Sequence, residues 1–175
     1  MTKTKKLTLS ALFIALGIVL PFFTGQIPQI GNLLLPMHIP AMLCGFICGG
    51  PSGFLVGLIT PILRSLLIGR PMMMPTAVGM AVEVATYGLV TGLMYSRLKH
   101  KKLGIYISLI TAMIAGRITW GLISMILYRI LSNPFTWQYF VAETLLNSFP
   151  GIILQLILIP AIIYGLQRTH LHNNN

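Results

Sequence analysis

Long apolar runs alternate with short clusters of Gly, Pro and charged residues along the whole chain. Gly and Pro interrupt regular structure, and charged residues are costly in hydrocarbon, so each cluster marks an expected helix boundary. A helix needs about 20 residues to cross a bilayer. The pattern therefore predicts six transmembrane helices. The first two cover residues 7–23 and 33–48, and the third follows a hairpin turn at 49–53 and ends at 68. The last three cover 76–95, 103–131 and 139–166. The second and third are short and rich in Gly and Pro, which predicts tilted or broken helices.

Composition supports a membrane protein. Of the 175 residues, 55% are hydrophobic and 8% are charged, and the mean hydropathy is +0.85. A soluble domain carries roughly a quarter charged residues, so this chain cannot cover a water-exposed surface. The fold class we expect is an all-α bundle of six transmembrane helices, forming a single domain over residues 1–175.

The distribution of positive charge predicts the topology. The chain has twelve Lys and Arg residues and two acidic residues, which gives a formal charge of +10. In a soluble protein this excess would suggest nucleic acid, but here anionic lipid explains it and no nucleic-acid partner is expected. The positive-inside rule favours cytoplasmic termini, with eight of the twelve basic residues on that side: Lys3, Lys5, Lys6, Arg97, Lys99, Lys101, Lys102 and Arg168. The first apolar run has no small-residue cleavage site before Pro21, which favours a retained helix over a signal peptide.

Polar side chains recur at helical spacing on three of the predicted helices. Residues three or four apart share one face of a helix, and the three faces are formed by Thr76, Met80, Glu83 and Tyr87; by Arg117, Trp120, Ser124 and Tyr128; and by Glu143, Asn147, Gly151 and Gln155. Polar groups in hydrocarbon turn toward the bundle interior. The three faces predict one shared cavity that opens outward, and Arg117 would form its floor unless it pairs with Glu83.

Each charged candidate has two interpretations. Glu83 and Arg117 form either a buried ion pair that holds helices together or a ligand contact. His38 either ends a helix or caps a pocket. Arg64 lies near a helix end, where its side chain either faces the site or, as we expect, extends outward toward the interface.

The uncharged candidates are equally open. Asn147, Gln155 and Ser124 suit either hydrogen bonds between helices or ligand contacts. Trp120 and Tyr128 suit either packing or stacking on a flat ligand. The two cysteines, Cys44 and Cys48, are one helical turn apart without a neighbouring His, which favours a packing role.

No enzyme motif occurs in the sequence, and in particular no phosphate-binding loop with Lys. We therefore expect no catalysis and no cofactor bound by this chain, and any pumping would draw on a partner's energy. Ala11 and Ala15 are four residues apart in the first helix, and small residues at this spacing permit close approach of another membrane helix.

Two stretches carry a resemblance to a known family. Residues 35–49 (LPMHIPAMLCGFICG) with 53–57 (GFLVG), and residues 75–88 from Pro-Thr-Ala to Glu-Val-Ala-Thr-Tyr-Gly, resemble the substrate-binding S components of energy-coupling factor vitamin transporters, especially the pantothenate branch. The resemblance implies a multi-pass subunit of the bacterial plasma membrane that binds a vitamin from outside. It also implies docking through Ala11 and Ala15 onto a membrane scaffold, the T component, with ATP and Mg²⁺ held by two partner ATPases.

The choice of vitamin stays open between two chemistries. Pantothenate would place its carboxylate on Arg117 and its other polar groups on Asn147, Gln155 and Tyr128. Hydroxymethylpyrimidine or pyridoxine would instead stack on Trp120 or Tyr128, with Glu83 or Glu143 accepting hydrogen bonds. Branch resemblance favours pantothenate. Two rival functions remain. One is a membrane protein whose polar groups serve only packing, and the other is a channel or exporter subunit. A channel would need polar stripes through the full depth of its helices.

Overall fold

The computed structural model describes residues 1–24, 35–99, 101, 103–131 and 148–172. Every regular element in these ranges is helical: α1 (Lys3–Val19), η1 (Leu20–Thr24), α3 (His38–Cys48), α4 (Gly50–Ile68), η2 (Met73–Ala77), α5 (Val78–Leu98), α6 (Gly104–Ile130) and α8 (Phe149–His172). Five segments, 3–23, 50–68, 73–98, 104–130 and 149–168, are long and apolar enough to cross a membrane. The all-helical membrane architecture is thus the predicted one.

Several helices begin at other residues than the hydropathy pattern predicts, because capping and turn residues also determine where a helix starts. Helix α1 begins at Lys3 because Thr2 caps it, its Oγ1 accepting a hydrogen bond of 3.4 Å from the amide of Lys5. Helix α3 has 11 residues, about 17 Å of helix, so it does not by itself span a bilayer core of about 30 Å. The expected broad turn at residues 49–53 is shorter than predicted, because α4 already begins at Gly50. Only Gly49, with a φ of 97°, separates α3 from α4.

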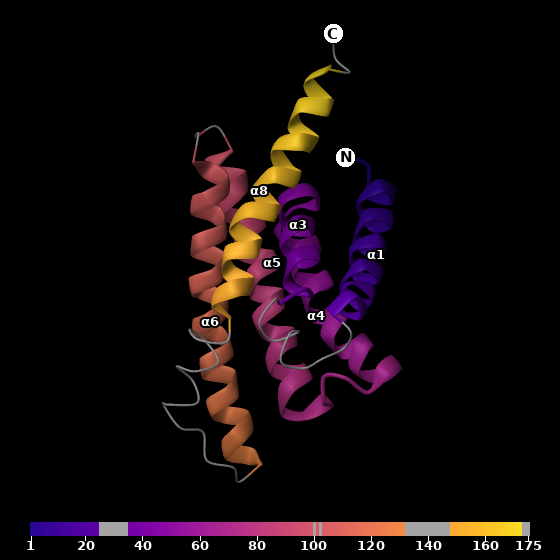
Figure 1. Cartoon of the computed structure of the whole chain (residues 1–175), viewed down its shortest axis with the longest axis vertical. Coiled ribbons are helices and arrows are strands. Elements are labelled where there is room, and N and C mark those ends of the chain that lie inside the picture. Colours follow the sequence, from indigo (N-terminus) through magenta and orange to yellow (C-terminus); the bar gives the residue numbers. More distant parts are fainter. Residues whose placement is uncertain (25–34, 100, 102, 132–147, 173–175) are drawn as a thin grey trace.

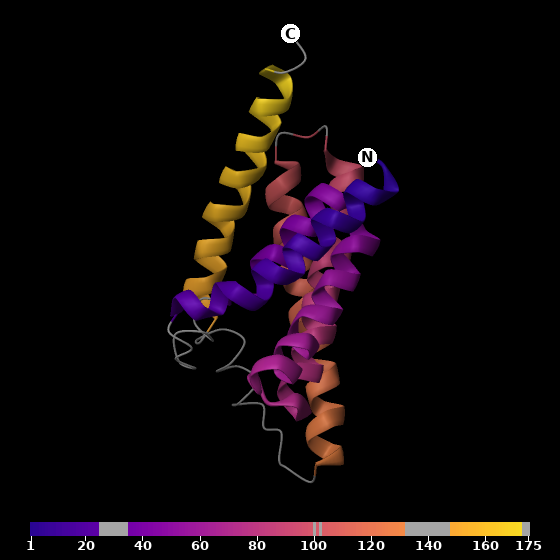
Figure 2. The same ribbon diagram turned by 90° about the vertical axis from the view of Figure 1, so that its right-hand side faces the viewer.

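Helix α5 is the centre of the bundle. It packs against α3, α4 and α6, while α1 lies against α3 and α4, and α8 lies against α3 and α6 (Figures 1 and 2). The buried apolar core is formed by side chains from α1, α3, α4, α5, α6 and α8. A polar group on the inner face of α5 is therefore surrounded by protein rather than lipid.

A seam of glycines brings α3, α4 and α5 into backbone contact. A Cβ atom at Gly88 would overlap the backbone of Gly53, and one at Gly45 or Gly53 would overlap the carbonyl group of Gly88. Gly57 is equally close to the backbone of α5. These glycines therefore allow α3 and α4 to pack closely against α5. Gly49 is the exception, because it forms the turn and has open space around it.

Helix α1 presents two different faces. Phe13 and Gly17 are buried, and a Cβ atom at Gly17 would overlap the methyl group of Thr60 on α4. Ala11 and Ala15, on the opposite side, are exposed. The small-residue face is thus exposed on the outside of the described bundle.

The two cysteines pack as predicted. Cys44 and Cys48 are buried free thiols in the apolar core. The Sγ of Cys44 lies 3.8 Å from the Oγ of Ser10 on α1.

Three basic segments gather at one end of the bundle. The start of α1, the end of α8 and the connection from α5 to α6 all lie there (Figures 1 and 2). These segments contain most of the basic residues assigned above to the cytoplasmic side. The positive-inside rule expects such basic segments to lie together on one side of the membrane, as these three do.

The glycine seam predicts a sharp sensitivity to one methyl group. Gly88→Ala should lower the free energy of unfolding by about 1–3 kcal/mol, because the new atom meets backbone that cannot move aside. Gly165→Ala on α8, where an added Cβ meets nothing within 4 Å, is the matched control. Thermal unfolding in detergent measures both, and an equal melting temperature for the two variants would contradict the seam.

Candidate functional site

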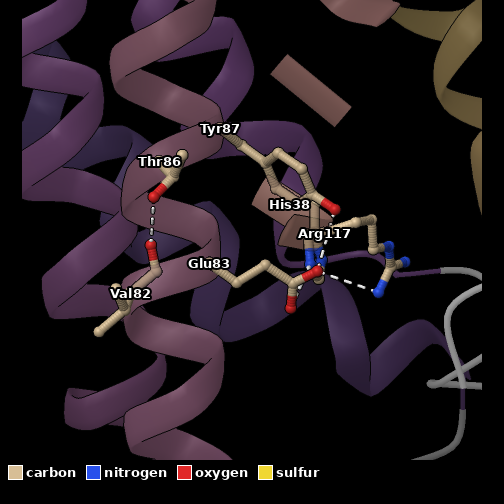
Figure 3. A network of polar contacts seen from close by, with 6 residues as sticks. All are labelled: His38, Val82, Glu83, Thr86, Tyr87 and Arg117. Carbon is tan, nitrogen blue, oxygen red and sulfur yellow. Dashed lines mark hydrogen bonds and ion pairs between the residues drawn. The ribbon is translucent and has the colours of Figure 1, made fainter. Parts of the chain in front are cut away.

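A buried polar cluster lies where α3, α5 and α6 meet (Figure 3). Glu83 of α5 is at its centre and has 2% of its surface exposed. Its Oε1 is 3.0 Å from Nη1 of Arg117 on α6 and accepts a 2.9 Å hydrogen bond from the hydroxyl of Tyr87. Its Oε2 is 3.8 Å from Nε2 of His38 on α3. One carboxylate thus connects three helices.

Local structure explains how these side chains meet. Glu83 and Tyr87 are four residues apart in α5 and share its inner face. The Tyr87 ring lies against Gly116, where any Cβ would overlap it, so this glycine lets the ring approach α6. The same ring lies 5.2 Å from the imidazole of His38, centroid to centroid. Sequence reasoning missed Gly116, although its place directly before Arg117 was a signal of close approach.

His38 is the first residue of α3, where its amide donates a 3.1 Å hydrogen bond to the carbonyl of Leu35. Pro40 is tolerated in this first turn because its missing N–H would have no intrahelical partner there. The side chain of His38 is 1% exposed and points at Glu83 rather than away from the bundle. It is therefore both a helix-end residue and a member of the cluster.

Several buried nitrogens of the described residues have no hydrogen-bond partner. In the cluster they are Nη2 of Arg117 and the two ring nitrogens of His38, and outside it they are Nε of Arg64 on α4 and Nε2 of Gln155 on α8. Buried polar groups are nearly always satisfied in folded proteins, so each such group calls for an explanation. Together they offer donors to a molecule rich in oxygen acceptors.

The predicted polar face of α6 does turn toward α5. Trp120 and Ser124 lie beside Gly79, with the indole Nε1 3.7 Å and the Ser124 Oγ 3.8 Å from where a Cβ of that glycine would be. Gly79 is one turn before Glu83 on the same face of α5. Tyr128 continues this face and is half-buried. The structure thus brings Trp120 and Ser124 next to the cluster.

The polar face of the last helix is only partly described. Gln155 of α8 is 1% exposed and faces inward with Ile159 and Ile163. Glu143 and Asn147, the other predicted ligand contacts of this face, lie outside the described residues.

Two expectations about individual side chains are wrong. Thr76 is exposed and does not join the face of Glu83, because it belongs to the π-helical turn η2 that precedes α5 rather than to α5 itself. Arg64 does not extend outward either. It is buried at 7% exposure against α3.

The comparisons with known proteins identify the family. The sequence profile described as "ECF transporter, substrate-specific component" matches residues 5–163. The chain belongs to this family, whose members are transport subunits of the membrane rather than enzymes. No curated protein and no solved structure matched the chain.

The cluster predicts a characteristic order of stability among variants. Glu83→Gln should cost about 3–5 kcal/mol, because it leaves the Arg117 guanidinium buried without its counter-charge. Tyr87→Phe removes one hydrogen bond to a charged group and should cost about 1–3 kcal/mol. The double variant Glu83→Gln with Arg117→Met should be more stable than Glu83→Gln alone. Thermal unfolding in detergent tests the order, and a Glu83→Gln protein as stable as wild type would contradict the ion pair's structural role.

Proposed function

We propose that this chain is the high-affinity binding subunit of an energy-coupling factor importer, and that its substrate is a water-soluble vitamin, with pantothenate the best candidate. Family membership supports the subunit role. The single observation that supports the substrate class is the set of buried nitrogens on Arg117, His38 and Gln155 that have no hydrogen-bond partner among the described residues. A molecule carrying several oxygen acceptors would satisfy them.

Pantothenate has the matching chemistry. It carries a carboxylate, an amide carbonyl and two hydroxyl groups on a flexible, nearly linear skeleton. The Nη2 of Arg117 and the N–H of the His38 imidazole offer hydrogen bonds to such oxygens. Gln155 offers another from α8, and Tyr128, Asn147 and Glu143 are further proposed contacts. Because Nη1 of Arg117 is held by Glu83, the guanidinium is preorganised for the ligand.

Flat, nitrogen-rich vitamins are the second candidate substrates. Hydroxymethylpyrimidine or pyridoxine would stack on Trp120, which lies on the face of α6 that turns toward α5. These ligands also need a carboxylate that accepts their donors. The Oε1 of Glu83 already accepts from Tyr87 and pairs with Arg117, so only Oε2 is left for such a donor. The nitrogens of Arg117, His38 and Gln155 without a hydrogen-bond partner suit the oxygens of pantothenate better.

A protein whose polar groups serve only packing is the rival without a ligand. Such a protein would be expected to satisfy its own buried polar atoms. The unpartnered nitrogens of His38, Arg117 and Gln155 weigh against it.

Transport would need a docking surface for the partners that supply energy. The exposed Ala11 and Ala15 of α1 suit contact with the scaffold T component, because small side chains permit close approach of a helix in lipid. The scaffold would in turn carry two ATPases that bind ATP and Mg²⁺. This assembly would sit in a bacterial plasma membrane, with both termini of this chain cytoplasmic.

Binding of a vitamin panel to the purified chain tests the proposed substrate. Isothermal titration in detergent should detect one tight ligand, pantothenate, without any partner subunit. Arg117→Lys keeps the charge but loses the planar fork, so we expect at least a tenfold weaker affinity in a folded protein. Arg129→Lys, at an exposed position near the end of α6, is the control. Tight binding of pyridoxine or hydroxymethylpyrimidine alone would replace pantothenate, and no binding to any vitamin would contradict the proposal.

Bulky substitutions on α1 test the docking surface. Replacing both Ala11 and Ala15 by Trp should abolish uptake and co-purification with the scaffold, while ligand affinity stays unchanged. Leu12 and Leu16 are also exposed on α1 and have the same spacing, so their double replacement by Trp is the matched control. Normal uptake by the Ala11→Trp/Ala15→Trp variant would rule out this surface.

A further inference from the structure

Arg64 is a buried cation for which the described part of the chain provides no carboxylate partner. The residue belongs to α4 and is 7% exposed. Its Nη1 donates to the Sδ of Met37 at 3.9 Å, and its Nε has no hydrogen-bond partner. A thioether is a weak acceptor and carries no charge. Burial of a cation in this way is unfavourable unless something else supplies the counter-charge.

The charges of the described interior also leave Arg64 without a counter-charge. Within the described residues, both recorded ion pairs are made by Glu83, with Arg117 and with His38. Glu83 is therefore already engaged by Arg117. The second acid of the chain, Glu143, lies outside the described residues. The described interior thus holds two arginines and one carboxylate.

The position of Arg64 connects it to the cluster of Glu83, Arg117, His38 and Tyr87. Its contact, Met37, directly precedes His38 at the start of α3. His38 in turn lies 3.8 Å from the carboxylate of Glu83. The N-terminal end of α3 itself carries partial positive charge and so adds to the attraction of an anion. An elongated ligand with an anionic end would reach both Arg64 and the cluster.

We propose that Arg64 is a specificity-determining residue that binds the anionic group of the transported vitamin, while the cluster binds its uncharged polar part. This inference rests on the proposed function and deepens it, because it selects vitamins that carry a carboxylate. From the sequence alone, an outward orientation was the favoured interpretation of Arg64. The thioether of Met37 holds the guanidinium in place when no ligand is bound.

A pair of ligands that differ only in charge tests the proposal. Pantothenate has a carboxylate where pantothenol has a neutral hydroxyl group. Isothermal titration of the purified chain in a neutral detergent should show that wild type binds pantothenate more tightly than pantothenol. Arg64→Met should weaken pantothenate binding about 10- to 100-fold, the usual range for a charge-assisted hydrogen bond. Pantothenol affinity should change less than about threefold.

Two further variants serve as controls for charge and fold. Arg64→Lys should restore part of the preference for pantothenate, because it keeps the charge. Arg129→Met makes the same substitution at an exposed arginine and should change neither affinity. Thermal unfolding without ligand should show Arg64→Met at least as stable as wild type, since it removes a buried, unneutralised charge.

The outcomes separate this inference from the proposed function. Tight pantothenate binding that Arg64→Met leaves unchanged, or an equal loss for both ligands, would overturn the role of Arg64 and leave the substrate standing. If the chain binds only a neutral or cationic vitamin, or no vitamin at all, both the role of Arg64 and the proposed substrate are overturned. Phosphatidylglycerol binding that is lost in Arg64→Met, with pantothenate affinity unchanged, would assign the site to a lipid headgroup and also overturn it.

Discussion

The burial of one carboxylate inside a membrane bundle is the constraint around which the rest of this structure is arranged. Glu83 is on the central helix α5 and is removed from water. Charged groups in hydrocarbon need partners, and here they come from α3 and α6 and from the next turn of α5. The position of each of these helices is therefore coupled to the same ionised group. A buried ion pair gives little net stability against an apolar replacement, so its presence calls for a functional reason.

Close helix packing makes this arrangement possible. The glycines of α3, α4 and α5 allow backbone contact along one side of α5, and Gly116 allows the Tyr87 ring to lie against α6 on the other. Dispersion contacts of this kind are a principal attraction between helices in lipid, where the hydrophobic effect is absent. They hold α5 in the register that directs Glu83 and Tyr87 at their partners. The unpartnered nitrogens nearby are then a local exception within an otherwise well-packed interior.

The sequence predicted the features that depend on periodicity and composition. The membrane class follows from the cost of charge in lipid, and the inward face of α6 follows from the spacing of its polar residues. The pairing of Glu83 with Arg117 was one of two stated alternatives, and both follow from the same two causes. It did not predict the burial of Arg64, because that depends on where α3 begins relative to α4. Nor did it predict the exposure of Thr76, since a helical spacing pattern does not reveal that η2 ends and α5 begins only after this residue.

The central claim is that the cluster around Glu83 forms part of a ligand site rather than a purely structural polar core. A structure of the chain determined with pantothenate bound tests this claim most directly. We predict ligand oxygens within hydrogen-bond distance of Arg117 Nη2 and of a His38 ring nitrogen, with the Glu83–Arg117 ion pair intact. A ligand bound elsewhere, with no contact to α3, α5 and α6 at this cluster, would contradict the account.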